Sequence, residues 1–243
     1  MNVGDGAQGT GDRLGTGGLE NTTCPPSPVP RHLGIAAKYP TRFLRSYVRS
    51  KLSRDPVYEA VLGHVRESNE PILDVGCGVG VLEMFLRDRG VRVPMTGIDV
   101  DEQKLAVARN LGIDGATFDA ASSVELPPFR GTVVILDLLH YLTNDEQQRA
   151  LAQALDRTSG LVIVRDAVRD GTLRYRATVV QETFARAVGW LRVPRLNFPT
   201  VEQVVAPFHA AGFDVSVAPL WGKTPLNNYL FVFKRASCGI TSA

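Results

Sequence analysis

An apolar run followed by three alternating glycines constrains the fold more than any other feature of this sequence. The run is LDVGCGVG, in which Gly76, Gly78 and Gly80 follow a strand-like segment that ends near Asp74. The next segment, VLEMFLRDRG, has apolar side chains at helical spacing and closes with a glycine. A strand, a glycine-rich turn and a helix in this order are typical of a sheet edge at which backbone approaches a ligand closely.

The same alternation of apolar runs and amphipathic stretches continues along the chain. Strands are expected within 71–76, 93–99, 116–119, 131–142 and 161–167, with helices between most of them. A helix at 200–211 precedes two runs, FDVSVAPLW and NNYLFVFKR, which we expect to pair as an antiparallel hairpin. The sequence therefore predicts an α/β chain with a doubly wound, mostly parallel seven-stranded sheet and an antiparallel C-terminal strand.

Shifts in composition predict where the folded part begins and ends. Residues 1–30 hold seven glycines and no aromatic residue, so we expect a flexible tail that cannot bury enough apolar surface to order itself. The small, polar residues 236–243 are expected to be flexible as well. One domain is expected over 31–235, and within it 168–199 is too long for an ordinary connection and mixes arginines with aromatic residues.

Charge and cysteine content exclude several classes of protein. The 27 basic and 25 acidic residues leave a net charge of +2, too small for a chain that neutralises nucleic acid along its surface. Three cysteines cannot form a disulfide framework for 243 residues, so we expect a reducing, cytoplasmic compartment. No run approaches about eighteen apolar residues, and the start lacks the pattern of a secretion signal, so no transmembrane segment is expected. No histidine and cysteine spacing predicts a metal site.

The glycine turn departs from the dinucleotide-binding pattern G-x-G-x-x-G/A, because Val81 occupies its last position. The form D-x-G-x-G-x-G instead resembles class I S-adenosylmethionine-dependent methyltransferases, and the similarity extends from about residue 52 to 235. It implies a Rossmann-like methyltransferase fold and S-adenosyl-L-methionine as cofactor. Two alternatives stay open: a nicotinamide-dependent reductase, and a catalytically silent methyltransferase-like binding subunit.

This resemblance places cofactor contacts at the ends of the first four strands. The first turn would hold the amino-acid half of the cofactor, and Asp99 after the second strand would accept both ribose hydroxyls. The implied set is Asp74, Gly76, Cys77, Gly78, Gly80, Asp99, Val100, Asp119, Ala120 and Asp137. Taken alone, the three glycines would also fit a plain tight turn, and Asp99 would also fit a helix cap.

The segment LDLLHYL after the fourth strand replaces the N-P-P-Y or D-P-P-Y of enzymes that methylate exocyclic amines or protein amides. His140 and Tyr141 are therefore our candidate catalytic residues, with His140 able to accept a hydroxyl proton near neutral pH. A histidine that is hydrogen-bonded for structure alone is the alternative. The acidic trio of the magnesium-dependent catechol methyltransferases is absent from the sequence.

Two basic features remain. Residues 31–54 carry seven Lys or Arg and no acidic residue, with an apolar face at helical spacing. They predict either a helix that covers the cofactor or a docking face, with Arg42, Arg45, Arg49 and Lys51, for an acidic partner. The resemblance to methyltransferases implies that the connection 168–199 lies on the substrate side. Arg174, Tyr175 and Arg176 are therefore candidates for acceptor binding. Plain solvation of these arginines is the alternative.

A narrower resemblance concerns SYVRSKLSRDPVY, LDLLHYL, VRDAVRDGTLRYR and PLWGKTPLNNYLFVFKR. These segments look like the methyltransferases of bacterial aryl polyene and xanthomonadin-type pigment clusters, in secondary metabolism. The resemblance implies oxygen or carbon methylation of a hydroxyaryl or polyene acceptor, with an acyl carrier protein as partner. An acidic carrier would account for both basic features together.

Overall fold

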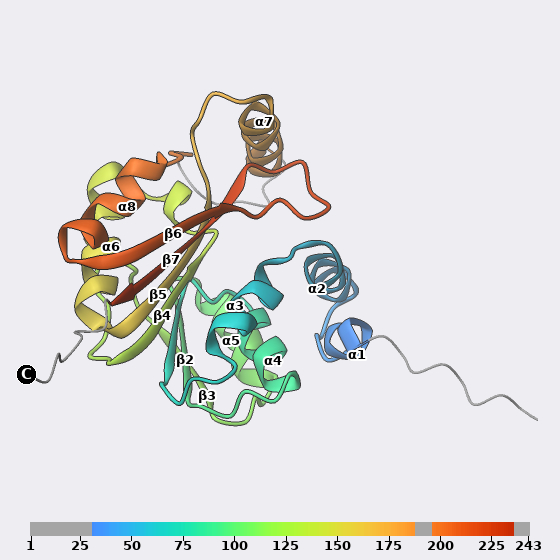
Figure 1. The fold of residues 1–243 in the computed structure, drawn as a ribbon. Helices are drawn as coiled ribbons and strands as arrows, with labels where there is room; N and C mark the ends of the chain where they lie inside the picture. The colour runs from blue at the N-terminus through green and yellow to red at the C-terminus, as the bar shows by residue number, and fades with distance from the viewer. Residues whose placement is uncertain (1–30, 188–195, 236–243) are drawn as a thin grey trace, which may run out of the picture.

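The computed structural model describes residues 31–187 and 196–235, so the two predicted tails lie outside the described residues (Figure 1). The strands are β1 (Ile72–Val75), β2 (Met95–Asp99), β3 (Ala116–Ala120), β4 (Gly131–Leu136), β5 (Thr158–Ala167), β6 (Phe213–Pro219) and β7 (Asn228–Arg235). They form one sheet in the order β3-β2-β1-β4-β5-β7-β6. Strands β1 to β5 pair in parallel, and β7 is antiparallel to both β5 and β6. The predicted fold class and the terminal hairpin are confirmed.

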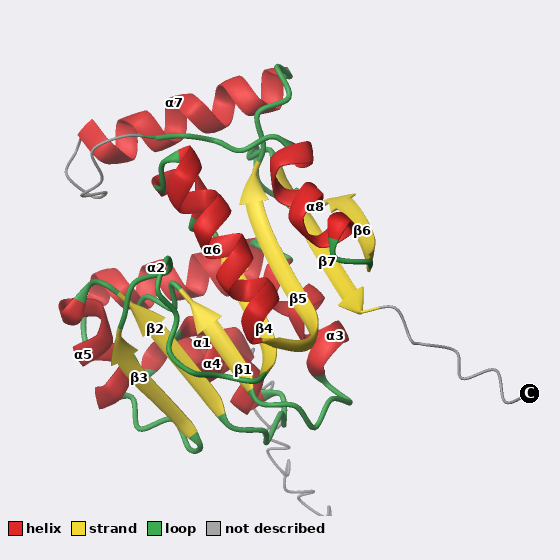
Figure 2. Cartoon of the chain, turned by 90° about the vertical axis from the view of Figure 1, so that its left-hand side faces the viewer, coloured by secondary structure: helices red, strands yellow, loops and turns green. Residues whose placement is uncertain are grey.

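Helices cover both faces of this sheet (Figure 2). The helical elements are α1 (Arg31–Ala37), α2 (Arg42–Arg54), α3 (Val57–Val65), α4 (Val81–Asp88), α5 (Glu102–Asn110), the 3-10 turn η1 (Leu139–Tyr141), α6 (Asn144–Arg157), α7 (Leu173–Ala187) and α8 (Val201–Ala210). One core joins α1 to α5 to the sheet, and the other joins α6 and α8 to its opposite face. Strand β1 is buried throughout and contributes alternate residues to the two cores, as a central parallel strand should.

Three segments differ from the sequence expectation. The basic segment 31–54 is two helices rather than one, because Pro40 disfavours helix before it and Thr41 caps α2 by accepting from the Leu44 amide. The run 131–142 leaves the sheet after Leu136, where Asp137 has a φ of 55° and turns the chain into η1. The described part of the connection 168–199 contains the long helix α7, and residues 188–195 lie outside the described residues.

None of the helices in the described ranges combines the length and the apolar character needed to cross a membrane.

Gly131, at the start of β4, provides a test of the packing between β4 and β1. An ideal Cβ at this position would lie 2.3 Å from the carbonyl oxygen of Pro71 and 2.8 Å from the ring of Phe129. Because the strand pairing holds that carbonyl in place, we expect Gly131→Ala to lower the free energy of unfolding by about 1–3 kcal/mol in urea titrations. The control is Gly160→Ala in β5, whose Cβ would meet Arg235 at 3.6 Å. An equal loss in both variants would contradict the prediction.

Candidate active site

The glycine turn between β1 and α4 presents backbone rather than side chains. Gly76, Gly78 and Gly80 have φ values of 85°, 56° and 72°, in the left-handed region that favours glycine. A Cβ at Gly80 would lie 3.1 Å from the Phe118 ring, so this glycine permits close packing. At Gly78, the described residues place a single atom, in the Lys104 side chain, as near as 4.0 Å. The space over the middle of the turn is therefore open for a ligand.

Asp99 at the end of β2 is bonded to this turn. Its carboxylate accepts hydrogen bonds from the Gly78 amide at 3.0 Å and from the Asp101 amide at 2.8 Å. Asp101, not Asp99, caps helix α5 by accepting from the amides of Gln103 and Lys104. The alternative role of Asp99 as a helix cap is therefore not observed, which leaves its carboxylate at the edge where the turn is open.

The remaining predicted cofactor residues of β2 and β3 lie beside Asp99. Val100 follows it and is 76% exposed. Asp119 and Ala120 are exposed at the end of β3, where Ala120 is the pairing partner of Asp99. The apolar side chain of Val100 is thus exposed next to Asp99 and Asp119, at the ends of β2 and β3, as expected for a ligand-binding surface.

Beneath the turn lies a buried acidic pair, Asp74 and Glu83. Burial raises the pKa of Asp74 to about 7. Burial, followed by the charge of Asp74, raises the pKa of Glu83 well above its ordinary value. Both carboxyl oxygens of Glu83 are buried and lack hydrogen-bond partners in the described part of the chain. Cys77 is buried here too, and burial raises the pKa of its thiol, so it is not a reactive thiolate. The sequence analysis missed Glu83.

His140 in η1 forms a buried pair with Asp166, the penultimate residue of β5. His140 Nδ1 lies 2.6 Å from Asp166 Oδ1, and the His140 amide donates to Asp166 Oδ2 at 3.3 Å. Since a carboxylate only accepts, Nδ1 carries the proton and Nε2 has a free lone pair. Within residues 31–187 and 196–235, buried Nε2 has no hydrogen-bond partner. Burial opposes the charged imidazole, but the Asp166 carboxylate outweighs this and raises the pKa of His140.

Aromatic side chains from three segments surround His140. The Tyr141 ring is 3.9 Å away, and Phe198 stacks on the imidazole at 5.4 Å. Tyr175 of α7 meets Phe198 edge-on at 5.6 Å, and the Tyr141 hydroxyl donates to Glu182 of the same helix at 3.5 Å. Burial raises the pKa of Tyr141, so its hydroxyl stays protonated near neutral pH. The arrangement is that of a base surrounded by ring faces.

A partly buried ion-pair network ties helix α2 to the sheet next to this group. Arg165 of β5 is 1% exposed and pairs with Asp55 and Asp137. Lys51 of α2 lies 3.0 Å from Asp137 and 3.5 Å from Asp55. Lys51 therefore points inward rather than out, and we remove it from the expected docking surface. The sequence analysis missed Asp55 and Arg165.

The three candidate acceptor-binding residues of α7 have different surroundings. Arg174 donates to the carbonyl oxygen of Thr224 at 2.7 Å, and its guanidinium lies 4.4 Å from the Trp221 ring centre. Arg176 is exposed, and Tyr175 alone belongs to the aromatic group around His140. Acceptor binding by Arg174 and Arg176 stays a prediction. Over the described ranges, no three His, Cys, Asp or Glu side chains are grouped so as to hold a metal ion.

Part of the sequence is similar to known methyltransferases. A family model described as a methyltransferase domain matches residues 72–159. Ubiquinone biosynthesis O-methyltransferases from Stutzerimonas stutzeri (strain A1501) and Azoarcus sp. (strain BH72) are 34% and 30% identical over 86 and 107 residues. These matches cover 32% and 41% of this chain and only 36% and 45% of the relatives' lengths. The matched family segment contains the glycine turn, Asp99 and His140.

Solved structures show the same fold. The magnesium protoporphyrin IX methyltransferase ChlM from Synechocystis PCC 6803, with bound SAH, has a TM-score of 0.60 at 18% identity, over 84% of this chain and 92% of that chain. The mitomycin 7-O-methyltransferase MmcR has a TM-score of 0.60 at 17% identity, over 80% of this chain and 57% of that chain. The fold is therefore the Rossmann-like methyltransferase fold. The methyltransferase resemblance is supported over residues 72–159, whereas the narrower one to pigment-cluster enzymes stays a prediction.

Proposed function

We propose that this protein transfers a methyl group from S-adenosyl-L-methionine to a hydroxyl oxygen of a small aromatic acceptor. The observation that carries the proposal is the His140–Asp166 pair, whose free Nε2 lies at the same sheet edge as the open glycine turn. Parallel strands end together, so the turn after β1, η1 after β4 and Asp166 near the end of β5 share that edge. The relatives that match are O-methyltransferases, which agrees with oxygen as the atom methylated.

The described residues fit this cofactor. The open backbone at Gly78 admits its amino-acid half, with Asp74, Gly76 and Cys77 lining the turn. The Asp99 carboxylate has lone pairs for two ribose hydroxyls, and exposed Val100 offers an apolar surface to the adenine. Asp119, Ala120 and Asp137 complete the set at the ends of β3 and β4. When bound, the cofactor supplies an electrophilic methyl group on a sulfonium.

The chain's own part in the chemistry is to orient the acceptor and take its proton. The rings of Tyr141, Tyr175 and Phe198 favour a flat aromatic acceptor. His140 Nε2 accepts the hydroxyl proton, and the Asp166 carboxylate fixes the tautomer and stabilises the imidazolium. Burial excludes water, so the hydroxyl is deprotonated only where the methyl group is held.

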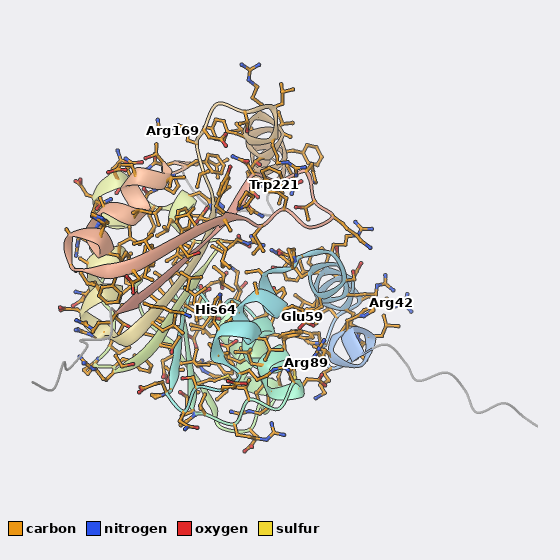
Figure 3. All side chains as sticks on the ribbon, viewed as in Figure 1. Arg42, Glu59, His64, Arg89, Arg169 and Trp221 are labelled. Carbon is orange, nitrogen blue, oxygen red and sulfur yellow. The ribbon has the colours of Figure 1, made fainter. Side chains whose placement is uncertain are left out.

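The acceptor in this proposal is a hydroxyaryl group, free or bound to an acyl carrier protein in the cytoplasm. The support for a carrier is the outer face of α1 and α2, where Arg42, Arg45 and Arg49 line a hollow of about 240 Å³ together with Leu33, Ala36, Ala37 and Ser46. Arg42 points away from the sheet (Figure 3). Such a face attracts an acidic partner. Arg45 is partly engaged, because its Nε donates to the Tyr39 carbonyl at 2.7 Å.

The cofactor assignment predicts the effect of Asp99→Ala. Removing the acceptor of two hydroxyl donors should weaken S-adenosyl-L-methionine binding by about 1.5–3 kcal/mol in isothermal titration calorimetry. The matched control is Asp101→Ser, which keeps the α5 cap and should bind normally. Binding of NADPH in place of S-adenosyl-L-methionine would instead favour the reductase alternative.

The base assignment predicts the behaviour of His140 and Asp166 variants. His140→Gln should reduce kcat with a hydroxyaryl acid by about 10²- to 10⁴-fold, measured from the mass shift of the product. Cofactor binding, measured by calorimetry, should be unchanged. Tyr141→Phe keeps the ring and is the control. Protonated His140 cannot accept a proton, so the rate should rise with pH through its pKa. Since Asp166 raises that pKa, Asp166→Asn should move the rise to lower pH and lower its plateau. A full rate for His140→Gln would refute the base role.

The carrier assignment predicts a substrate-dependent effect of charge. Arg42→Glu combined with Arg49→Glu should slow methylation of carrier-bound acceptor and leave the free acceptor unaffected, because steering acts on the acidic partner. Raising salt should mimic the substitutions, since exposed charges are screened over about 8–10 Å. Arg66→Glu with Arg130→Glu, on other exposed surfaces, is the control. Equal losses for free and carrier-bound acceptor would show that α2 acts on the cofactor or on stability instead.

A further inference from the structure

Helix α7 has an apolar stripe on its outer side. Leu173, Val180 and Phe184 are 81%, 69% and 68% exposed, and their spacing of seven and four residues places them along one side of the helix. The opposite side holds the helix to the body: Thr178 is buried and accepts from the Asn227 amide at 2.8 Å. Figure 2 shows α7 lying across the end of β5, beyond the rest of the molecule. The stripe is thus a surface feature and not part of either core.

The charges around this stripe are basic. Arg169 precedes the helix and is exposed, and Arg176 is exposed on the helix itself. Glu182 accepts from Tyr141 on the inner side of the helix, and Asp170 is exposed beside Arg169, where it accepts from the Thr172 hydroxyl at 2.7 Å. The outer face of the helix therefore combines apolar side chains with the positive charge of Arg176, and Arg169 and Asp170 precede the helix.

Trp221 extends the apolar surface at this end of the molecule. It is 36% exposed in the loop between β6 and β7, and Arg174 of α7 stacks over its ring at 4.4 Å. Figure 3 shows Arg169 and Trp221 at the end of the molecule that carries α7. A tryptophan beside an arginine is suited to a membrane–water interface, where the indole ring lies near the acyl chains and the guanidinium stays in contact with water and headgroups.

We propose that the outer face of α7, together with Trp221, docks onto an anionic lipid surface. A helix with an apolar stripe and basic flanks lies in the plane of a bilayer interface, where apolar burial and attraction to anionic headgroups add. A second copy of the chain is the poorer occupant, because a two-fold interface uses the same patch of both copies and would gather Arg169 and Arg176 of each at one contact. Anionic headgroups complement those charges.

This docking would place the candidate site close to the lipid. The inner side of α7 contributes Tyr175 and Glu182 to the group around His140. An acceptor with an apolar tail could then reach that group without leaving the membrane surface. The docking itself does not depend on the proposed reaction, so each can fail separately.

The test is vesicle flotation with the full chain. Vesicles of phosphatidylcholine with phosphatidylglycerol are compared with vesicles of phosphatidylcholine alone, at low and high salt. We expect binding to the anionic vesicles, at least about tenfold weaker binding to the neutral ones, and weakening by salt. Val180→Glu with Phe184→Glu should reduce binding by about tenfold or more, because two buried apolar contacts become charges facing anionic lipid. Val201→Glu, also an exposed valine on a helix, is the matched control and should bind as wild type.

Three results would overturn the proposal. The first is no binding of the wild type to anionic vesicles. The second is equal binding by the Val180→Glu/Phe184→Glu variant, which would place the contact elsewhere; loss with Arg42→Glu/Arg49→Glu alone would place it on α2. The third is a dimer of the wild type in analytical ultracentrifugation that the α7 substitutions dissociate, which would assign the stripe to a second copy. Circular dichroism and calorimetry with S-adenosyl-L-methionine report separately on folding and on the proposed function.

Discussion

A fully buried arginine needs opposite charges, and Arg165 finds them in Asp55 and Asp137. Asp55 follows α2, Arg165 lies within β5, and Asp137 directly follows β4, so one network joins α2 to the central strands of the sheet. Moving α2 away would remove Asp55 from the buried Arg165 and Lys51 from Asp137, so each ion of the remaining Arg165–Asp137 pair would lose one of its opposite charges. Helix α2 is therefore held at the carboxyl edge of the sheet, as the cover of that edge, by electrostatics as well as by the apolar contacts of Val48.

That cover closes over an edge with two different kinds of surface. On the β1 and β2 side, glycines expose backbone and the Asp99 carboxylate lies at the open turn, which favours a cationic ligand. On the β4 and β5 side, a buried imidazole with a free nitrogen lies among ring faces. A sulfonium cofactor suits the first surface and a neutral aromatic hydroxyl suits the second. The division follows from the strand order, because β1 and β4 are neighbours at which the connections diverge to opposite faces.

Local patterns in the sequence were enough to predict the sheet, the hairpin and the turn, because strands and glycine turns depend on near neighbours. Side-chain direction was not predictable in the same way. Lys51 reads as one more cation of a basic helix, yet it pairs with Asp137, 86 residues away. Asp166 lies in an apolar run, where an acidic residue is a signal of a buried partner. That signal is present in LVIVRDA, but the identity of the partner, His140, depends on tertiary packing.

The inward turn of Lys51 matters because it separates two electrostatic roles on one helix. Arg42 and Arg49, on the solvent side of α2, act through water and are screened within a Debye length. Lys51, partly buried beside Asp137, acts through a lower dielectric than bulk water. Burial lowers the pKa of His140 most and the charge of Lys51 adds to that effect, whereas the Asp166 carboxylate outweighs both and raises the pKa. The network that fixes the cover over the sheet edge therefore also takes part in setting the basicity of the candidate base.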